Sequence, residues 1–271
     1  MRRTSQASFD AVAQGFDPVL RAAGADAARI GEQLFGFVDA LDASTQLRRA
    51  VSDPARDGDA KAALVAQLLG GKVDDRVVEV LGALVRARWS SDADFADAVE
   101  RLAADSVLAA AENAGELERV EEEVFRFLRL MARERELRRA LSDRNAKPDA
   151  RAELARCVLS GTAHPVTVQL VARAAQAPRG RRIVGALSDV ERLIAARRRK
   201  LVATVTTAQP LTEAQTARLA TLLENAYGRS VQLNTIVDPA VIGGLRIEVG
   251  SDVVNATVLS RLEDVRRRLA G

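Results

Sequence analysis

The sequence repeats itself after 90 residues, and this repeat limits the folds that are open to the chain. Residues 47–53 read Leu-Arg-Arg-Ala-Val-Ser-Asp, and residues 137–143 read Leu-Arg-Arg-Ala-Leu-Ser-Asp. The register holds without a gap from Leu47–Gly71 onto Leu137–Gly161, where 12 of the 25 aligned positions are identical. Many matches in one register indicate a duplicated structural unit. The first 200 residues are therefore predicted to contain two related domains.

Each copy is predicted to be a bundle of helices, because its apolar residues recur at three- and four-residue spacing. Two stripes in the first copy show this spacing most clearly. They consist of Phe9, Val12, Phe16, Val19 and Leu20, and of Val77, Val80, Leu81, Leu84 and Val85. A third predicted stripe consists of Ala63, Leu64, Leu68 and Leu69. Abundant Ala, Leu, Arg and Glu also favour helix, since these side chains lose little rotamer freedom there.

Polar residues and glycines are predicted to mark where the helices of each copy begin and end. Ser52-Asp53 and Ser142-Asp143 carry side-chain oxygens that can cap the start of a helix. Gly70-Gly71 and Ser160-Gly161 can end the next helix, because glycine tolerates the left-handed conformation found there. The same breaks at the same offset support the duplication.

One long helix is predicted to belong to both bundles. Residues 94–113 contain no helix-breaking residue, and the first glycine after them is Gly115. A helix of this length would close the first bundle and open the second.

The pattern changes after the second copy. Alternating β-branched residues predict a strand over 201–207, and Thr212 and Gln215 have the spacing of a capping box at the start of a helix. That helix is predicted to end near Tyr227. Further strands are predicted over 231–237, 245–249 and 253–255, and a final helix carries Val258, Leu262, Val265 and Leu269 on one face.

The expected fold is mainly α, with two tandem related helical bundles that share a long helix, followed by a small α/β domain. The expected domains are residues 1–110, 111–200 and 201–271.

The last of these domains resembles the delta subunits of F-type ATP synthases, the family that includes the mitochondrial oligomycin-sensitivity-conferring protein. Apolar, acidic, proline and paired glycine residues fall at the spacing of the family signature. The matching positions are Val231, Leu233, Val237, Asp238, Pro239, Ile242, Gly243, Gly244, Ile247 and Gly250. The family has one helical bundle before this domain, whereas this chain has two.

The signature residues have a structural interpretation. Asp238-Pro239 is predicted to set a turn, and Gly243-Gly244 to supply positive φ angles before the next strand. A phosphate-binding loop would need more glycines, a lysine and a helix after it. We therefore predict no phosphate site here.

The resemblance implies a non-catalytic subunit of the peripheral stalk, or stator, which links the catalytic head to the b-type stalk and resists rotor torque. In this family the helical bundle binds N-terminal segments of the alpha subunits, and the C-terminal domain binds the b subunit. By position in the family fold, the alpha-binding groove would be lined by Phe9, Val12, Phe16, Val77, Leu81 and Leu84. Apolar stripes commonly face their own core, so these side chains could instead be buried.

The second copy has Ser106 where the first copy has Phe16, which favours the first bundle as the alpha-binding one. The resemblance also implies a peripheral location on the cytoplasmic face of the bacterial plasma membrane, with the membrane reached only through the complex. No apolar run approaches the ~18 residues of a membrane-spanning helix.

Residues suited to catalysis are scarce. His164 is the single histidine and is expected in a turn between helices, and Cys157 is the single cysteine and is expected as a small core residue. No nucleophile, base and orienting group can be assembled from these two residues. We expect no enzyme, no cofactor and no metal site.

The charges are nearly balanced, with 40 basic and 37 acidic residues and a net charge of +3. A nucleic-acid-binding protein commonly clusters its basic residues and interleaves aromatic ones. Neither pattern is visible, so we expect no nucleic-acid partner. The alternative function is a helical protein- or RNA-binding adaptor unrelated to ATP synthesis.

Overall fold

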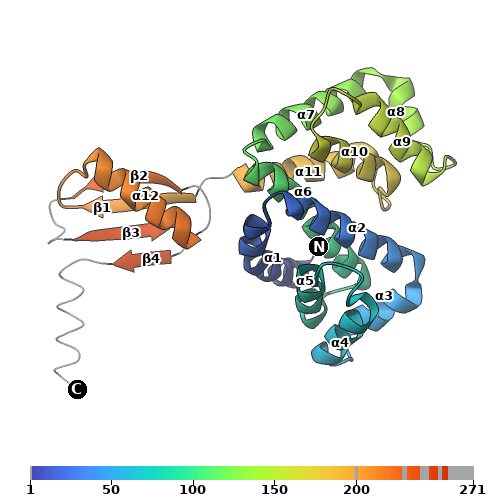
Figure 1. Cartoon of the computed structure of the whole chain (residues 1–271), viewed down its shortest axis with the longest axis horizontal. Helices are drawn as coiled ribbons and strands as arrows, with labels where there is room; N and C mark the ends of the chain where they lie inside the picture. The colour runs from blue at the N-terminus through green and yellow to red at the C-terminus, as the bar shows by residue number, and fades with distance from the viewer. Residues whose placement is uncertain (1, 199–200, 228–230, 239–243, 250–251, 256–271) are drawn as a thin grey trace. The chain divides into compact units, whose positions relative to one another are not determined.

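The computed structural model describes residues 2–198, 201–227, 231–238, 244–249 and 252–255. The chain divides into two units, Met1–Ala196 and Arg197–Gly271. The described part of the first unit is helical, and the second unit combines a sheet with a helix (Figure 1). The predicted fold class, mainly α with a small α/β domain at the end, is confirmed.

The helices of the first unit fall into two matching series. The first series is α1 (Arg3–Ala23), η1 (Gly24–Asp26), α2 (Ala27–Ala43), α3 (Thr45–Ser52), α4 (Gly58–Leu69) and α5 (Asp75–Arg86). The second series is α6 (Asp92–Asn113), α7 (Leu117–Arg133), α8 (Arg135–Ser142), α9 (Pro148–Leu159), α10 (Pro165–Gln176) and α11 (Ile183–Arg198). The four helices α2 to α5 begin and end 90 residues before α7 to α10. The duplication predicted from the sequence is therefore a structural one.

Helix α6 belongs to both bundles, as the absence of a break in its sequence predicts. It packs against α1 and α2 of the first copy and against α7 and α10 of the second. Its side chains are buried on nearly every face. The buried residues are Phe95, Ala96, Ala98, Val99, Leu102, Ala103, Ala104, Ser106, Val107, Leu108, Ala109, Ala110 and Ala111. The burial of these residues shows that protein surrounds most of this helix.

Gly31 allows α2 to lie close against α6. A Cβ atom at this position would be 2.5 Å from Cγ2 of Val107 and 2.6 Å from the carbonyl oxygen of Ala103. The equivalent residue of α7 is Glu121, and α7 makes no comparably close approach to α11. The two copies therefore share their helices but differ in how tightly these helices pack.

The start of α4 differs from the prediction. Asp57, and neither Ser52 nor Asp53, caps this helix, because its carboxylate accepts hydrogen bonds from two N–H groups of the first turn. Ser52 lies in α3, and the carboxylate of Asp53 accepts a hydrogen bond from the N–H of Ala55 in the connecting turn. In the second copy α9 begins with Pro148 and has no side-chain cap. Both predicted helix ends are confirmed, since α4 and α9 stop directly before the predicted breaks.

The buried face of α4 was also predicted wrongly. Leu68 of the predicted stripe is 39% exposed, and the buried residues are Lys61, Ala62 and Val65. In α9 the side chain of Cys157 is exposed, which corrects its expected place in the core.

A buried cation explains this difference. Lys61 donates a hydrogen bond from Nζ to the carbonyl oxygen of Asp53 at 3.3 Å, where α3 ends. Arg151 occupies the equivalent position in α9 and donates to the carbonyl oxygens of Asp143 (2.7 Å) and Gln176 (3.0 Å), at the ends of α8 and α10. Cations oppose the partial negative charge at helix C-termini. The long aliphatic stems of these side chains fill core space that the sequence pattern assigned to leucines.

The second unit contains a four-stranded sheet with the strand order β2-β1-β3-β4. Its elements are β1 (Leu201–Thr207), α12 (Glu213–Tyr227), β2 (Val231–Val237), β3 (Leu245–Val249) and β4 (Asp252–Asn255). β1 pairs parallel with β2 and antiparallel with β3, so α12 is the crossover between two parallel neighbours. The core consists of Val205, Leu223, Val231 and Ile247.

The predicted capping box at the start of α12 is present. The N–H of Gln215 donates to Oγ1 of Thr212 at 3.2 Å, and the N–H of Thr212 donates to Oε1 of Gln215 at 2.9 Å. The four strands also lie where the sequence predicts them. The predicted final helix lies outside the described residues.

Candidate binding surfaces

The six residues predicted to line an alpha-binding groove lie on the two neighbouring helices α1 and α5. Five of them are buried, and Val12 is half-buried. The buried ones are Phe9, Phe16, Val77, Leu81 and Leu84, none more than 6% exposed. The structure therefore brings the two stripes together inside one core cluster. They hold α1 and α5 in place, and direct contact of these side chains with a partner stays a prediction.

Aromatic contacts fix the edges of this helix pair. The indole N–H of Trp89 donates to the carbonyl oxygen of Leu84 at 2.7 Å, and the Trp89 ring meets the edge of Phe95 with centroids 5.9 Å apart. The guanidinium group of Arg101 lies 4.4 Å from the centroid of the Phe9 ring. These contacts tie α1 and the end of α5 to α6. The outer faces of α1 and α5 are thus held as a rigid surface.

The equivalent helix pair in the second copy, α6 and α10, lies against α2 of the first copy. Arg173 of α10 is only 7% exposed and bridges the two bundles. Its guanidinium group contacts the carboxylates of Asp39 on α2 (2.7 Å) and Glu100 on α6 (3.1 Å), and lies 4.7 Å from the centroid of the Phe35 ring. Burial alone would lower the pKa of Arg173, but hydrogen bonds and charge attraction from Glu100 and Asp39 raise it overall. Arg173 therefore remains charged at this junction.

Arg179 extends the same junction from the loop after α10. It lies within 3.5 Å of Asp42 on α2, within 3.6 Å of Asp97 and within 3.5 Å of Glu100 on α6. Its backbone has a positive φ of 49°, which is uncommon for a residue other than glycine. Surrounding contacts must stabilise such a conformation. Two arginines of the second copy thus bind four carboxylates of α2 and α6.

Sequence reasoning missed this junction, although the repeat contained a signal for it. Arg173 and Arg179 replace Ala83 and Trp89 of the first copy. A charged residue that appears in only one copy indicates a contact that only that copy makes.

Glu123 in the second copy and Gln33 in the first accept equivalent hydrogen bonds from the backbone N–H that precedes the fifth helix of each copy. Oε1 of Gln33 accepts a hydrogen bond from the N–H of Asp74 at 3.0 Å, directly before α5. Oε2 of Glu123 accepts from the N–H of His164 at 2.8 Å, directly before α10, and from Oγ1 of Thr167 at 2.6 Å. Burial raises the pKa of Glu123, but these hydrogen bonds and Arg119 outweigh it and lower the pKa overall.

His164 is a helix cap. Its Nδ1 accepts a hydrogen bond from the N–H of Val166 at 3.2 Å, at the first turn of α10. Among the described residues, no group of three His, Cys, Asp or Glu side chains is placed to hold a metal ion. The geometry around the single histidine is that of a structural residue.

The signature residues of the second unit mainly build its sheet. Val231 and Ile247 are core residues, and Leu233 packs against them. The N–H of Asp238 donates to the carbonyl oxygen of Thr207 at 2.8 Å, which ties the end of β2 to β1. Gly244 has a φ of 82°, a conformation that favours glycine. Among the other signature residues, the structure describes Val237, which ends β2. Four signature residues lie outside the described residues, namely Pro239, Ile242, Gly243 and Gly250.

Exposed apolar side chains are the second feature of this unit. Leu222 on α12 is 57% exposed, and Ile236 and Val237 at the end of β2 are 47% and 46% exposed. β2 is an edge strand of the described sheet, so its outer backbone groups have no neighbouring strand. Exposed apolar groups on an edge strand are typical of surfaces that bind a partner.

A comparison with known families decides the identity of the chain. The sequence model of the ATP synthase delta (OSCP) subunit family matches residues 99–269, which is more than half of the chain. The chain belongs to this family. The match covers nearly all of the second copy together with the α/β unit, and the first copy precedes it.

Relatives in the delta subunit family resemble the chain over its whole length. ATP synthase subunit delta of Beutenbergia cavernae is 52% identical over all of both chains. The subunit of Kineococcus radiotolerans is 46% identical over 98% of this chain and 97% of its own, and that of Streptomyces griseus is 42% identical over all of both. Since these relatives align with both copies, the duplicated bundle is common to them and to this chain.

Membership in the delta subunit family makes the chain a structural, non-catalytic subunit of the ATP synthase peripheral stalk. Within the described part of the chain, no helix has the length and apolar character required to cross a membrane.

Proposed function

We propose that this delta-family subunit connects the catalytic head of ATP synthase to the b-type stalk and holds the head against rotor torque. The first bundle binds N-terminal segments of the alpha subunits, and the second unit binds the b-type subunit. The complex then holds the chain at the cytoplasmic face of the bacterial plasma membrane. In this proposal the boundaries 1–110, 111–200 and 201–271 separate a head-binding bundle, an additional bundle and a stalk-binding domain.

One observation carries the choice of the first bundle. Arg173, Asp39 and Phe35 join α10 to α2, so the α6–α10 pair of the second copy already has a neighbour within the chain. The α1–α5 pair of the first copy packs against the shared helix α6, and the described residues show no contact of comparable extent between this pair and α7–α11. A helical segment of another subunit can therefore lie along α1 and α5, as a helix in a groove.

The half-buried Val12 provides the test. In the full-length chain, Val12→Asp places a charge at the edge of the α1–α5 pair, where it opposes burial of a partner's apolar side chains. We expect a synthetic peptide with the N-terminal sequence of the alpha subunit to bind at least about tenfold more weakly to this variant. Fluorescence anisotropy of a labelled peptide measures the change.

Val168→Asp is the matched control, because Val168 is a half-buried valine on α10 in the second bundle. Peptide binding should be unchanged in this variant, and urea unfolding reports the cost of each substitution. Equal loss of binding in both variants, or no binding by the unaltered chain, would contradict the assignment of the alpha contact to the first bundle.

The stalk contact is tested in the same way at the second unit. Leu222→Asp should weaken binding of a C-terminal fragment of the b-type subunit, because it removes an exposed apolar side chain from the proposed surface. Leu68→Asp on α4 is the control, since Leu68 is also an exposed leucine but lies in the first unit. A b-type fragment that binds both variants as well as it binds the unaltered chain would argue for another stalk-binding surface.

A further inference from the structure

The junction between the two bundles shows how this type of bundle binds its neighbour. The ring of Phe35 on α2 is only 6% exposed, because Arg173 of the next bundle lies over it. Carboxylates of Asp39 and Glu100 surround that arginine. We call this face the α2 socket. Its aromatic residue is Phe35, its carboxylates are Asp39 and Glu100, and Arg173 of the next bundle occupies it.

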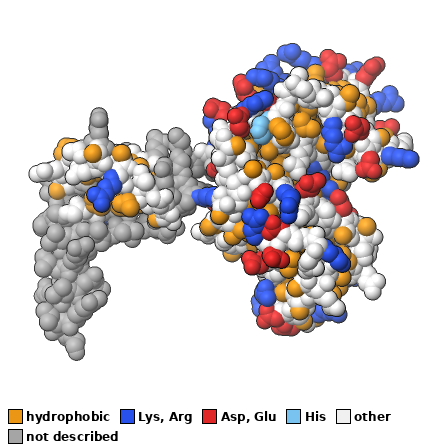
Figure 2. All heavy atoms as spheres, in the orientation of Figure 1, with side chains coloured by type: hydrophobic (Ala, Val, Ile, Leu, Met, Phe, Trp, Pro, Cys, Tyr) orange, Lys and Arg blue, Asp and Glu red, His pale blue; other side chains and the backbone are white. Residues whose placement is uncertain are grey.

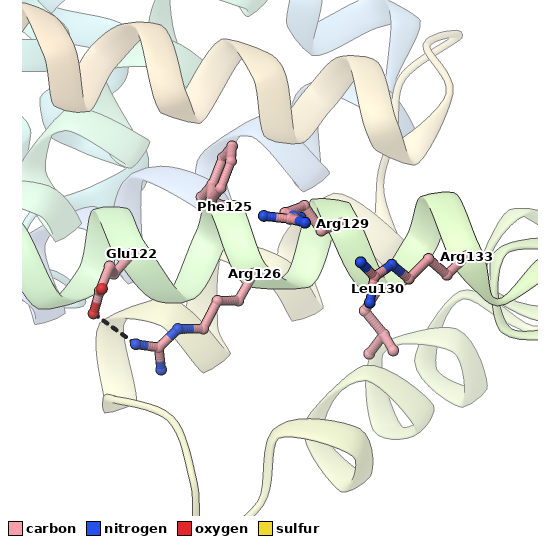
Figure 3. A pocket seen from close by; sticks show the side chains of 6 residues that line it. All are labelled: Glu122, Phe125, Arg126, Arg129, Leu130 and Arg133. Carbon is pink, nitrogen blue, oxygen red and sulfur yellow. Dashed lines mark hydrogen bonds and ion pairs between the residues drawn. The ribbon is translucent and has the colours of Figure 1, made fainter.

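The equivalent face of α7 has no bundle after it. Phe125 stands 90 residues after Phe35, and its side chain is 50% exposed. An open hollow of about 440 Å³ runs along α7, lined by Glu122, Phe125, Arg126, Arg129, Leu130 and Arg133. Figure 3 shows that all six side chains come from α7, with Phe125 and Arg129 on one side of the helix and Glu122, Arg126 and Leu130 on the other. The duplication thus leaves the last socket of the series open.

The charge of this open socket is opposite to that of the filled one. α7 carries Arg129 where α2 carries Asp39, and it carries Arg126 and Arg133 where α2 has uncharged residues. Figure 2 shows basic side chains over α7 and α8, with acidic side chains among them. A ligand that fits the open socket must therefore bring negative charge.

Two of these arginines are available to such a ligand. Arg126 pairs with Glu122 at 2.7 Å, whereas Arg129 lies 5.8 Å from the centroid of the Phe125 ring. Within the described part of the chain, neither Arg129 nor Arg133 is paired with a carboxylate. Guanidinium groups bind carboxylates through two parallel hydrogen bonds, and an aromatic ring beside them adds apolar contact area.

We propose that this face of α7 binds an acidic amphipathic helix of a partner protein. Carboxylates of the partner helix contact Arg129 and Arg133, and its apolar side chains cover Phe125. This interface lies on the second bundle and does not depend on the contacts of α1 and α5. It gives the second bundle of this chain a binding function of its own.

A second copy of the chain does not suit the socket. The residues that fill the α2 socket are Arg173 and Arg179, and the same basic residues of another molecule would meet Arg129 and Arg133. Like charges brought together in an interface oppose association. The chemistry therefore favours a different, acidic protein.

The test uses the full-length chain and a labelled peptide designed as an amphipathic helix, with leucines on one face and glutamates beside them. We expect it to bind the unaltered chain, and the double substitution Arg129→Glu with Arg133→Glu to weaken binding at least about tenfold. Phe125→Ala should weaken it by several fold through lost apolar contact. A peptide with lysines in place of the glutamates should bind the double variant more tightly than it binds the unaltered chain.

The control is Arg49→Glu with Arg88→Glu, because both arginines are exposed in the first copy and the change in net charge is the same. Binding of the acidic peptide by this control should stay within about twofold of the unaltered chain. An equal loss in the control, or equally tight binding of unstructured polyglutamate, overturns the proposal, because either result shows attraction to charge alone.

Two further measurements address other occupants. Sedimentation of vesicles containing anionic lipid detects a membrane surface, and analytical ultracentrifugation detects self-association of the chain. If the unaltered chain bound the vesicles and the Arg129 and Arg133 variant did not, the socket would bind a membrane surface and the proposal would be overturned. If the variant lost self-association instead, the occupant would be a second copy of the chain, which also overturns the proposal. A photocrosslinker at position 125 in the assembled ATP synthase should yield an adduct with an acidic helical segment of another subunit. Absence of any such adduct overturns it.

Discussion

Two glycines of α2 show how one missing Cβ atom positions a whole helix. Gly31 faces α6, whereas Gly36 faces open space and has no atom within 4 Å of a built Cβ. Glycine within a helix costs stability, because it has more backbone freedom to lose than alanine. At Gly31 the absence of a Cβ atom allows a close contact with α6, which offsets this loss of stability. At Gly36 no such contact is made.

Gly31→Ala should therefore lower the free energy of unfolding by about 2 kcal/mol, since its Cβ would overlap a backbone oxygen of α6. Gly36→Ala, on the same helix, should raise it by ~0.8 kcal/mol through helix propensity. Urea unfolding followed by circular dichroism measures both changes. Equal effects of the two substitutions would show that the close approach of α2 and α6 contributes nothing.

The lowered pKa of Glu123 leads to a prediction of how acid affects the stability of the second bundle. Its pKa is lowered in the folded chain, where two hydrogen bonds and Arg119 hold the charged form. A carboxyl group with a lowered folded pKa stabilises the fold fully above its unfolded pKa of about 4.3 and loses this contribution as pH falls through the folded value. The contribution is therefore present at neutral pH and disappears in acid.

Glu123→Gln gives the second bundle the residue that the first bundle has at this position. In the first bundle, Oε1 of Gln33 accepts the equivalent hydrogen bond from the N–H of Asp74. We expect this variant to be about 1 kcal/mol less stable at pH 7, because it loses the charged interactions and keeps a neutral acceptor. The difference from the unaltered chain should shrink as the pH is lowered below about 4.

Glu122→Gln removes the same charge from an exposed ion pair with Arg126, so it should change stability by less than about 0.5 kcal/mol. Urea titrations at a series of pH values compare the two variants. A constant difference for Glu123→Gln across the whole pH series would contradict the role of its ionised carboxylate.

At the scale of elements, the junction between α2, α6 and α10 depends on one buried arginine. Arg173→Ala leaves the carboxylate of Glu100 without its main partner and uncovers Phe35. Removing one partner of a buried ion pair is costly, so we expect a loss of about 3 kcal/mol in the free energy of unfolding. Amide hydrogen exchange should also accelerate in α2 and α10, where the two bundles meet.

Arg156→Ala on α9 is the control for this prediction, because Arg156 forms only an exposed pair with Glu153. Its effect should stay within about 0.5 kcal/mol. If Arg173→Ala were as harmless as this control, the two bundles would be held together by the shared helix and its apolar contacts alone.

The sequence predicts most elements of this chain, because their patterns are local. The stripe around Leu81 and Leu84, the uninterrupted helix over 94–113 and the capping box at Thr212 each depend on neighbours within a few turns. All three are present in the structure. The 90-residue repeat supplies the only long-range information, and it predicts the matching order of α2–α5 and α7–α10.

The features that the sequence does not predict are contacts between distant residues. Lys61 and Arg151 lie in the core because carbonyl groups at the ends of other helices bind them, and nothing in the local pattern shows this. The bonds of Arg173 to α2 and α6 join residues far apart in the chain. For the same reason the candidate groove residues could be assigned to α1 and α5, but their burial could not be read from their spacing.

At the scale of the whole molecule, the duplication adds a second bundle without adding a linker. α6 runs continuously from the first bundle into the second, and the arginine junction joins them again at α2 and α10. A stalk subunit must transmit load without yielding, and two bundles with a common helix have no flexible segment between them. The two bundles therefore form one continuous helical part of the subunit, and the second bundle exposes the α7 face as a further surface.

The shared helix leads to a prediction about fragments of the chain. Residues 1–113 include α6 and should fold, with helical circular dichroism and one cooperative urea transition. Residues 1–91 lack Phe95, Val99, Leu102 and Val107, which are all fully buried, so the apolar faces of α1 and α2 would lose their main partner. We expect this shorter fragment to show no cooperative transition.

The fragment 92–198 completes the comparison, because it contains α6 with all of the second copy. It should fold with lower stability per residue than the unit from which it is cut, since the face of α6 that α2 covers becomes exposed. A cooperative transition for residues 1–91, with the same midpoint as for residues 1–113, would show that the first bundle is complete without α6. The boundary between the two copies would then lie before this helix, and α6 would belong to the second bundle alone.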